Sequence, residues 1–221
     1  MAKRFIILLF FSSLFSEAFC QYPQFSFATD LGIQRNFKKE QQYWSVGHTV
    51  HTMFHFTPKE AVYIWFSYYS NGNFRNDVIA VAKDPFMTPH EVPYVNRAKM
   101  RPKHFSIGYK KYLKGSQEIE SGFSIYAYGG FGLLLGRIQN THSIALDTNV
   151  YRLPVLSGKA NFKRLTIDLG LGGEVPIGGD FYLYIEGRAW IPTTDYPSKY
   201  IFINNNAPLV GMLNGGLRLR F

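Results

Sequence analysis

The last eleven residues of the chain alternate between apolar and polar positions. The apolar parity carries Leu213, Leu217, Leu219 and Phe221, and the other carries Met212, Asn214, Arg218 and Arg220. A period of two indicates a β-strand with two different faces. Arginines on an inner face are costly in a soluble core because buried charges need partners. In a membrane barrel the apolar face meets lipid and charged residues line the interior, so the pattern predicts a transmembrane strand.

The same alternation predicts seven earlier strands. They span residues 25–34, 43–56, 61–70, 103–113, 123–135, 164–172 and 181–191. Residues 61–70 are apolar on both parities, so the facing of that strand stays open. Together these segments predict an all-β fold, an eight-stranded antiparallel up-and-down transmembrane β-barrel over residues 21–221.

The connections between these strands differ in length in a regular way. Short turns are expected at 57–60, 114–118 and 175–180, and long loops at 71–102, 137–162 and 192–207, with a shorter loop at 35–42. Membrane barrels keep long loops outside the cell and short turns in the periplasm. We therefore expect the three long loops outside and both termini in the periplasm.

Aromatic residues should form two girdles at the membrane interfaces. The periplasmic girdle would contain Phe25, Phe27, Phe54, Phe56, Phe181 and Phe221, and the outer one Trp44, Tyr68 and Phe105. The alternative is that these residues form the core of a two-sheet sandwich.

Charged residues fall on the inward parity of several predicted strands. They are Asp30, Lys110, Arg164, Asp168, Glu186, Arg188, Arg218 and Arg220, accompanied by His51, His55, Tyr126 and Tyr128. Eight strands enclose an interior that side chains just fill, and opposite charges there should pair into a plug. The sequence thus predicts a closed lumen, with a narrow channel as the alternative.

The N-terminus has the organisation of a secretory signal peptide over residues 1–20. A basic end with Lys3 and Arg4 precedes an apolar run at 5–15 and a small-x-small site at Ala18-Phe19-Cys20. The run is too short to favour the alternative, a membrane anchor. Phe19 and Glu17 do not fit a lipidation box. We expect cleavage after Cys20 or after Ala18. Cleavage after Cys20 would leave no thiol, and it would take the formal charge from +9 to +8.

The remaining positive charge indicates anionic partners. Arg97, Lys99, Arg101 and Lys103 are candidate contacts for lipopolysaccharide phosphates or another anionic surface. A solvated basic loop is the alternative. Nucleic acid is not expected as a partner of an exported chain.

Two histidine patterns suggest site chemistry. His104-Phe-Ser106 resembles the His-x-Ser pair of some eight-stranded outer-membrane lipid A deacylases, but it falls on the lumen face and no carboxylate is apparent nearby. Asp147 and Glu91 are the loop candidates for that carboxylate. His48 faces away from His51 and His55, which would lie about 13 Å apart, too far to share one zinc. We expect no catalytic, metal or cofactor site.

The eight strands, the leader and the terminal Phe221 resemble the small eight-stranded outer-membrane β-barrel family, which includes the OmpA transmembrane domain, OmpX and PorT-like barrels. The resemblance implies insertion by the barrel-assembly machinery, which would read Leu217, Leu219 and Phe221. No peptidoglycan-binding domain of the OmpA kind is expected after Phe221. The resulting hypothesis is a non-enzymatic outer-membrane protein whose loops contact lipopolysaccharide, a surface ligand or a neighbouring membrane protein. The alternatives are a lipid-modifying enzyme and a narrow channel.

Overall fold

The computed structural model describes residues 24–193 and 209–221. Its elements are β1 (Gln24–Asn36), the 3-10 turn η1 (Lys39–Gln41), β2 (Trp44–Thr57), β3 (Glu60–Ser70), β4 (Gly72–Ala82), β5 (Glu91–Lys114), β6 (Ser124–His142), β7 (Tyr151–Arg152), β8 (Gly158–Gly178), β9 (Phe181–Pro192) and β10 (Val210–Arg220). The predicted signal peptide and nearly all of the predicted loop 192–207 lie outside the described residues. Within the described residues, no helix is long and apolar enough to cross a membrane.

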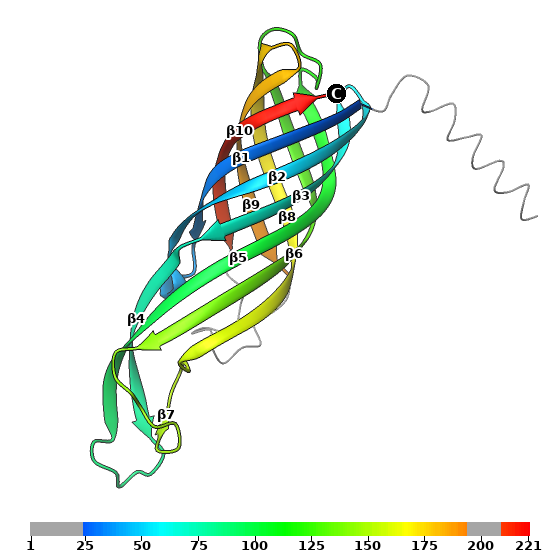
Figure 1. Cartoon of the computed structure of the whole chain (residues 1–221). Coiled ribbons are helices and arrows are strands. Elements are labelled where there is room, and N and C mark those ends of the chain that lie inside the picture. The colour runs from blue at the N-terminus through cyan, green and yellow to red at the C-terminus, as the bar shows by residue number, and fades with distance from the viewer. Residues whose placement is uncertain (1–23, 194–208) are drawn as a thin grey trace, which may run out of the picture.

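Eight of the strands form a closed antiparallel ring (Figure 1). The order is β3-β2-β1-β10-β9-β8-β6-β5, and the pairing of β3 with β5 closes it. The first and last strands pair along all of β10 and nearly all of β1, from Ser26 opposite Arg220 to Asn36 opposite Val210. The eight-stranded antiparallel barrel predicted from the sequence is confirmed.

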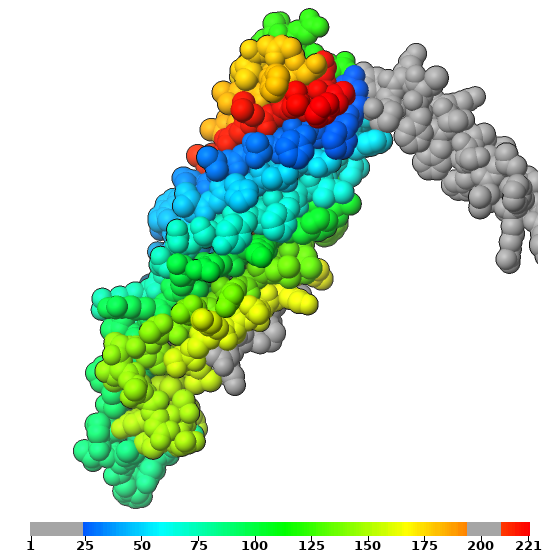
Figure 2. Space-filling view, viewed as in Figure 1, coloured from blue at the N-terminus to red at the C-terminus, as the bar shows by residue number. Residues whose placement is uncertain are grey.

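The barrel continues at one end into a projection that we call the tower, residues 72–102 and 137–161 (Figures 1 and 2). β4 pairs with the first part of β5, from Gly72 opposite Met100 to Val81 opposite Glu91. β6 continues to His142 beside β5, and β8 starts at Gly158. We call the opposite end of the barrel, which holds Gln24 and Phe221, the terminal end.

The prediction of long loops at 71–102 and 137–162 was therefore wrong. Most of these residues are strand, and the irregular parts are short. The tower has its own small core, formed by Val78, Ala80 and Tyr94 with Val92, Leu146, Tyr151 and Leu153 packed against them. In the sequence, the prolines and exposed charges of these segments made the alternation of apolar and polar residues hard to recognise. The predicted turn 175–180 is also shorter, because β8 runs to Gly178 and leaves only Gly179 and Asp180 as the connection.

The barrel wall is apolar on its outer surface. Leu31 is 75% exposed, Phe131 71% and Leu171 62%, while the alternate residues of the same strands are buried or half-buried. This arrangement contradicts the alternative of a two-sheet apolar core, because the apolar side chains point away from the interior. The burial pattern also settles the facing of β3, in which Tyr63 and Trp65 point inward.

Aromatic side chains gather where the first and last strands meet at the terminal end. Phe25 lies opposite Phe54 in the sheet register, and its ring centroid is 6.3 Å from that of Phe221. The Phe221 backbone N–H donates a 2.8 Å hydrogen bond to the Phe25 carbonyl. Trp44 lies toward the other end of the wall, where the Arg35 guanidinium is 4.8 Å from its ring centroid.

Candidate functional site: a plugged lumen and a basic belt

The barrel interior is charged and electrically balanced. Among the described residues, four carboxylates and four cations are buried, and the two sets have equal formal charge. The buried acids are Asp30, Asp168, Glu174 and Glu186, and the buried bases are Lys110, Arg164, Arg188 and Arg218. Buried charges are tolerated where they pair and hydrogen-bond. Two clusters and one histidine site hold seven of these eight groups.

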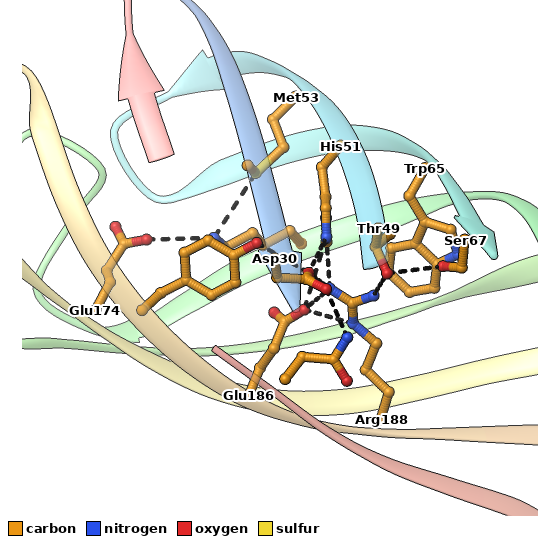
Figure 3. Close-up of polar contacts among 12 residues, drawn as sticks. Asp30, Thr49, His51, Met53, Trp65, Ser67, Glu174, Glu186 and Arg188 are labelled. Atoms are coloured by element: carbon orange, nitrogen blue, oxygen red, sulfur yellow. Dashed lines mark hydrogen bonds and ion pairs between the residues drawn. The ribbon is translucent and has the colours of Figure 1, made fainter. Parts of the chain in front are cut away.

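The first cluster surrounds Arg188 on β9 (Figure 3). Its guanidinium contacts Asp30 of β1 at 2.5 Å and also forms an ion pair with Glu186. It donates to Thr49 of β2 at 2.9 Å and lies 4.7 Å from the ring centroid of Trp65 on β3. One arginine thereby connects four strands through contacts across the lumen.

Asp30 accepts further hydrogen bonds around this arginine. Its carboxylate accepts from the Tyr184 hydroxyl at 3.0 Å and from the Asn214 amide at 2.7 Å, and it lies 2.7 Å from His51 Nε2. The Tyr126 hydroxyl donates to Glu186 at 3.0 Å. Strong charge-assisted hydrogen bonds of this type fix side-chain positions.

The second cluster lies nearer the terminal end and is centred on Glu174 of β8. The Glu174 carboxylate lies 2.7 Å from Arg218 Nη2 and 3.6 Å from Lys110 Nζ. It also accepts a 2.8 Å hydrogen bond from the Tyr112 hydroxyl. Arg218 also donates to Ser26, which bonds His55. The strand predicted from the sequence ends at residue 172, so the prediction did not include Glu174. Its place in the same alternation was the available signal.

The histidine site lies toward the tower. His104 Nδ1 accepts a 3.2 Å hydrogen bond from the Trp65 indole, and its Nε2 lies 3.3 Å from Asp168 and 2.9 Å from Thr166. The expectation that no carboxylate lies near His104 was wrong, since Asp168 comes from a distant part of the sequence. The loop candidates lie elsewhere, because Asp147 is in an exposed tower loop and Glu91 is at the far end of β5.

The geometry around His104 does not resemble a nucleophilic triad. Both ring nitrogens are engaged by Trp65, Thr166 and Asp168, and the ring stacks on Trp190 with centroids 4.1 Å apart. Ser106 is fully buried, and its hydroxyl donates to the Phe131 carbonyl at 3.2 Å. A nucleophile must share a hydrogen bond with its base and reach the substrate, whereas these side chains fill the interior.

The sequence also predicts Arg164 and Arg220 as lumen residues, and only Arg164 is buried. Arg164 is buried, with its guanidinium 5.9 Å from the centroid of the Phe162 ring. Arg220 does not belong to the lumen network, because it lies at the rim of the terminal end and bonds the exposed Asp180 at 2.7 Å. Arg220 is the last residue of β10 on the inward parity, and at that position the strand has already left the enclosed interior.

Asp30, His51 and Glu186 could geometrically hold a metal ion, since their ligand atoms lie within 4.8 Å of one another. The Arg188 guanidinium, however, already bonds Asp30 and Glu186 and contacts His51. A fixed cation therefore occupies the position where a metal ion would sit. His48 is exposed on the outer wall, and His55 bonds Ser26 at 2.9 Å.

An apolar cluster packs above the charged layers at the tower end of the lumen. It consists of Tyr43, Tyr69, Phe74, Ala98, Met100, Leu134, Ile138, Phe162, Trp190, Val210 and Met212. Between the charged clusters the enclosed space is only about 20 Å³, bordered by side chains such as Lys110, Tyr128 and Glu186. That space is about the size of one water molecule.

The outer wall changes from apolar to basic where the tower begins. We call Arg101 and Lys103 of β5, Arg137 of β6 and Lys163 of β8 the basic belt, and all four are exposed. They line a surface hollow of about 410 Å³ together with Tyr68, Leu135 and Asn161. Arg97 and Lys99, the other two predicted anionic contacts, lie farther along β5 and border a second hollow of about 950 Å³.

Two titratable side chains pack together within the tower. The rings of Tyr94 and His142 have centroids 4.7 Å apart. Burial raises the pKa of Tyr94 and lowers the pKa of His142. Both therefore favour their neutral forms near neutral pH, so they do not add charge to the tower.

The comparisons with known proteins support the fold but identify no family. The sequence matches no protein-family model and none of the curated proteins. Among solved structures, neisserial surface protein A is similar with a TM-score of 0.58 at 8% identity, covering 89% of this chain and 97% of that one. A major outer membrane protein from Thermus thermophilus has a TM-score of 0.52 at 11% identity, covering 89% and 99%.

A third similar structure is Ail, the attachment invasion locus protein of Yersinia pestis, in complex with the heparin analogue sucrose octasulfate. Its TM-score is 0.50 at 11% identity, and the match covers 91% of this chain and 100% of Ail. The chain therefore has the fold of small outer-membrane β-barrel proteins.

Proposed function

We propose that this chain is a non-enzymatic integral outer-membrane protein whose closed barrel anchors the tower outside the cell. The observation that carries the proposal is the inversion of polarity, with an apolar outer wall around a charged, filled lumen. Hydrocarbon is the solvent in which such a wall is stable, and a closed ring leaves no unpaired strand edge inside it. The filled lumen favours anchoring over transport.

The two ends of the barrel support one orientation in the membrane. Barrels of this fold keep short turns in the periplasm and larger structures outside. Here the tower projects from one end, and the opposite end has short connections such as Gly179-Asp180. We therefore assign the tower end to the cell exterior and the terminal end to the periplasm.

The tower offers a basic surface for anionic partners. Arg97 and Lys99 border its larger hollow, and none of the residues that line this hollow is acidic. Ail, a structural neighbour, was crystallised with a polysulfated heparin analogue. Candidate partners are lipopolysaccharide, another anionic surface ligand or a neighbouring membrane protein, and biogenesis would use the barrel-assembly machinery.

Cysteine labelling of intact cells tests this orientation. Phe86, at the tower tip, is 92% exposed, and Lys59 lies in the turn between β2 and β3 at the terminal end. In a Cys20→Ala background, we expect a membrane-impermeant maleimide to label Phe86→Cys on intact cells. Lys59→Cys should react only after the outer membrane is permeabilised.

The opposite pattern would reverse the assigned orientation. Equal labelling of both variants in a water-soluble extract free of detergent would exclude the membrane placement altogether. The protein's heat-modifiable gel mobility should accompany each measurement, because it reports whether the barrel is folded.

A further inference from the structure

The basic belt begins at the boundary of the apolar wall on three adjacent strands. The last outward apolar residues before the tower are Phe105 on β5, Leu135 on β6 and Leu165 on β8. The next outward residues along these strands are Lys103, Arg137 and Lys163. A step of two residues corresponds to about 6.6 Å along a strand. The cations therefore start immediately beyond the last side chains suited to hydrocarbon.

The sheet register brings these charges together. Arg101 lies directly opposite Arg137, and both Lys103 and Lys163 lie opposite Leu135 from its two sides. Like charges directly opposite each other destabilise a sheet unless an anion compensates them. None of the side chains that line the hollow is acidic. Within residues 24–193 and 209–221, none of the four cations forms an ion pair.

The hollow combines features that suit a phosphate group at a membrane surface. Arginine binds phosphate oxygens through two parallel hydrogen bonds, and lysine adds a compact charge. Tyr68, which lines the same hollow, is a residue type enriched at membrane interfaces. An acyl chain below the headgroup would meet Phe105 and Leu135 of the wall.

We propose that the basic belt binds the phosphate groups of an anionic lipid in the outer leaflet, with its acyl chains against the wall of β5, β6 and β8. This inference rests on the proposed membrane placement and names one ligand for the tower end. The proposal also assigns the four anionic contacts predicted from the sequence to two different ligands. Arg101 and Lys103 act at the lipid headgroup together with Arg137 and Lys163, while Arg97 and Lys99 remain for ligands outside the membrane.

Native mass spectrometry of the folded full-length protein tests the proposal. The probes are lipid A carrying two phosphates and the same lipid without phosphates, each mixed into detergent micelles. We expect the wild type to retain the phosphorylated lipid at a lipid concentration at least 10-fold lower than the dephosphorylated lipid. The triple variant Arg101→Gln/Arg137→Gln/Lys163→Gln should lose this preference.

A second triple variant controls for the change in net charge. Lys59→Gln/Lys111→Gln/Lys114→Gln also removes three exposed cations, but at the terminal end, and it should retain the preference. Heat-modifiable mobility confirms that each variant is folded, so a loss of lipid is not read from an unfolded chain.

Three outcomes would overturn the proposal. The first is equal retention of both lipids by the wild type, and the second is an unchanged preference in the first triple variant. The third is displacement of the lipid by inorganic phosphate at the same phosphate concentration, which would indicate a site for soluble anions. A folded barrel that inserts in membranes but shows any of these results would leave the proposed anchoring function intact.

Discussion

Arg188 shows at the scale of one residue why the interior tolerates charge. Its guanidinium bonds Asp30 and Glu186 and donates to Thr49, so each charged group has close partners. Removing one member of such a group leaves the others buried and uncompensated, which costs more than the intact arrangement contributes. The Arg188 ion pairs are therefore best tested by removing one partner and measuring the loss of stability.

We expect Arg188→Met to lower the free energy of unfolding by about 3–5 kcal/mol, the range for breaking a buried ion pair from one side. Urea titration in micelles, followed by tryptophan fluorescence and gel mobility, measures it. Arg220→Met is the matched control, because its pair with Asp180 is partly exposed and should change stability by less than about 1 kcal/mol. Equal effects of the two substitutions would contradict the network.

Ser106 provides the residue-scale test of the enzymatic alternative. Its hydroxyl donates to a backbone carbonyl inside the lumen, so Ser106→Ala should reduce stability by only about 0.5–1.5 kcal/mol, the net value of one hydrogen bond. Mass spectrometry of lipid A from cells with and without the protein should show identical spectra. A mass shift that depends on Ser106 would support catalysis instead.

At the scale of elements, the alternation of apolar and polar residues predicted the strands better than it predicted the contacts between side chains. Alternation in β1 and β10 was clear because one face of each strand is mostly apolar. It failed for β4 and the start of β5, where the tower leaves hydrocarbon and exposed positions become charged, so the apolar signal weakens although the pleat continues. Side-chain partners such as Glu174 with Arg218 or His104 with Asp168 depend on curvature across the lumen, which a linear pattern does not contain.

The last strand has both a structural and a proposed assembly role. Phe221 closes the seam through its backbone bond to Phe25 and its ring contact with the same residue. We expect deletion of Phe221 to reduce the fraction of protein with heat-modifiable mobility in cells by several-fold. Phe131→Ala, which removes an exposed aromatic side chain from the middle of the wall, is the control and should assemble normally. Normal assembly without Phe221 would argue against the terminal signal.

At the scale of the whole molecule, three layers of interior side chains follow one another along the barrel axis. The charged clusters fill the terminal and middle parts of the lumen, an apolar cluster lies above them, and the tower core continues outward. The outer surface changes from apolar to basic close to this apolar cluster. In the proposed function, the outer wall would anchor the protein, the apolar cluster would close the lumen and the tower would present the charged surface, all within one continuous sheet.

This layering predicts that the folded protein does not conduct ions. The enclosed space of about 20 Å³ holds roughly one water molecule, and an ion would have to lose its hydration shell to enter the apolar cluster beyond it, at a cost of many kcal/mol. Purified protein in planar bilayers should show no sustained conductance, with insertion verified by gel mobility of protein recovered from matching vesicles. A sustained, ion-selective conductance would mean that the charged layers rearrange into a path, and the role of the barrel would then be transport and not anchoring.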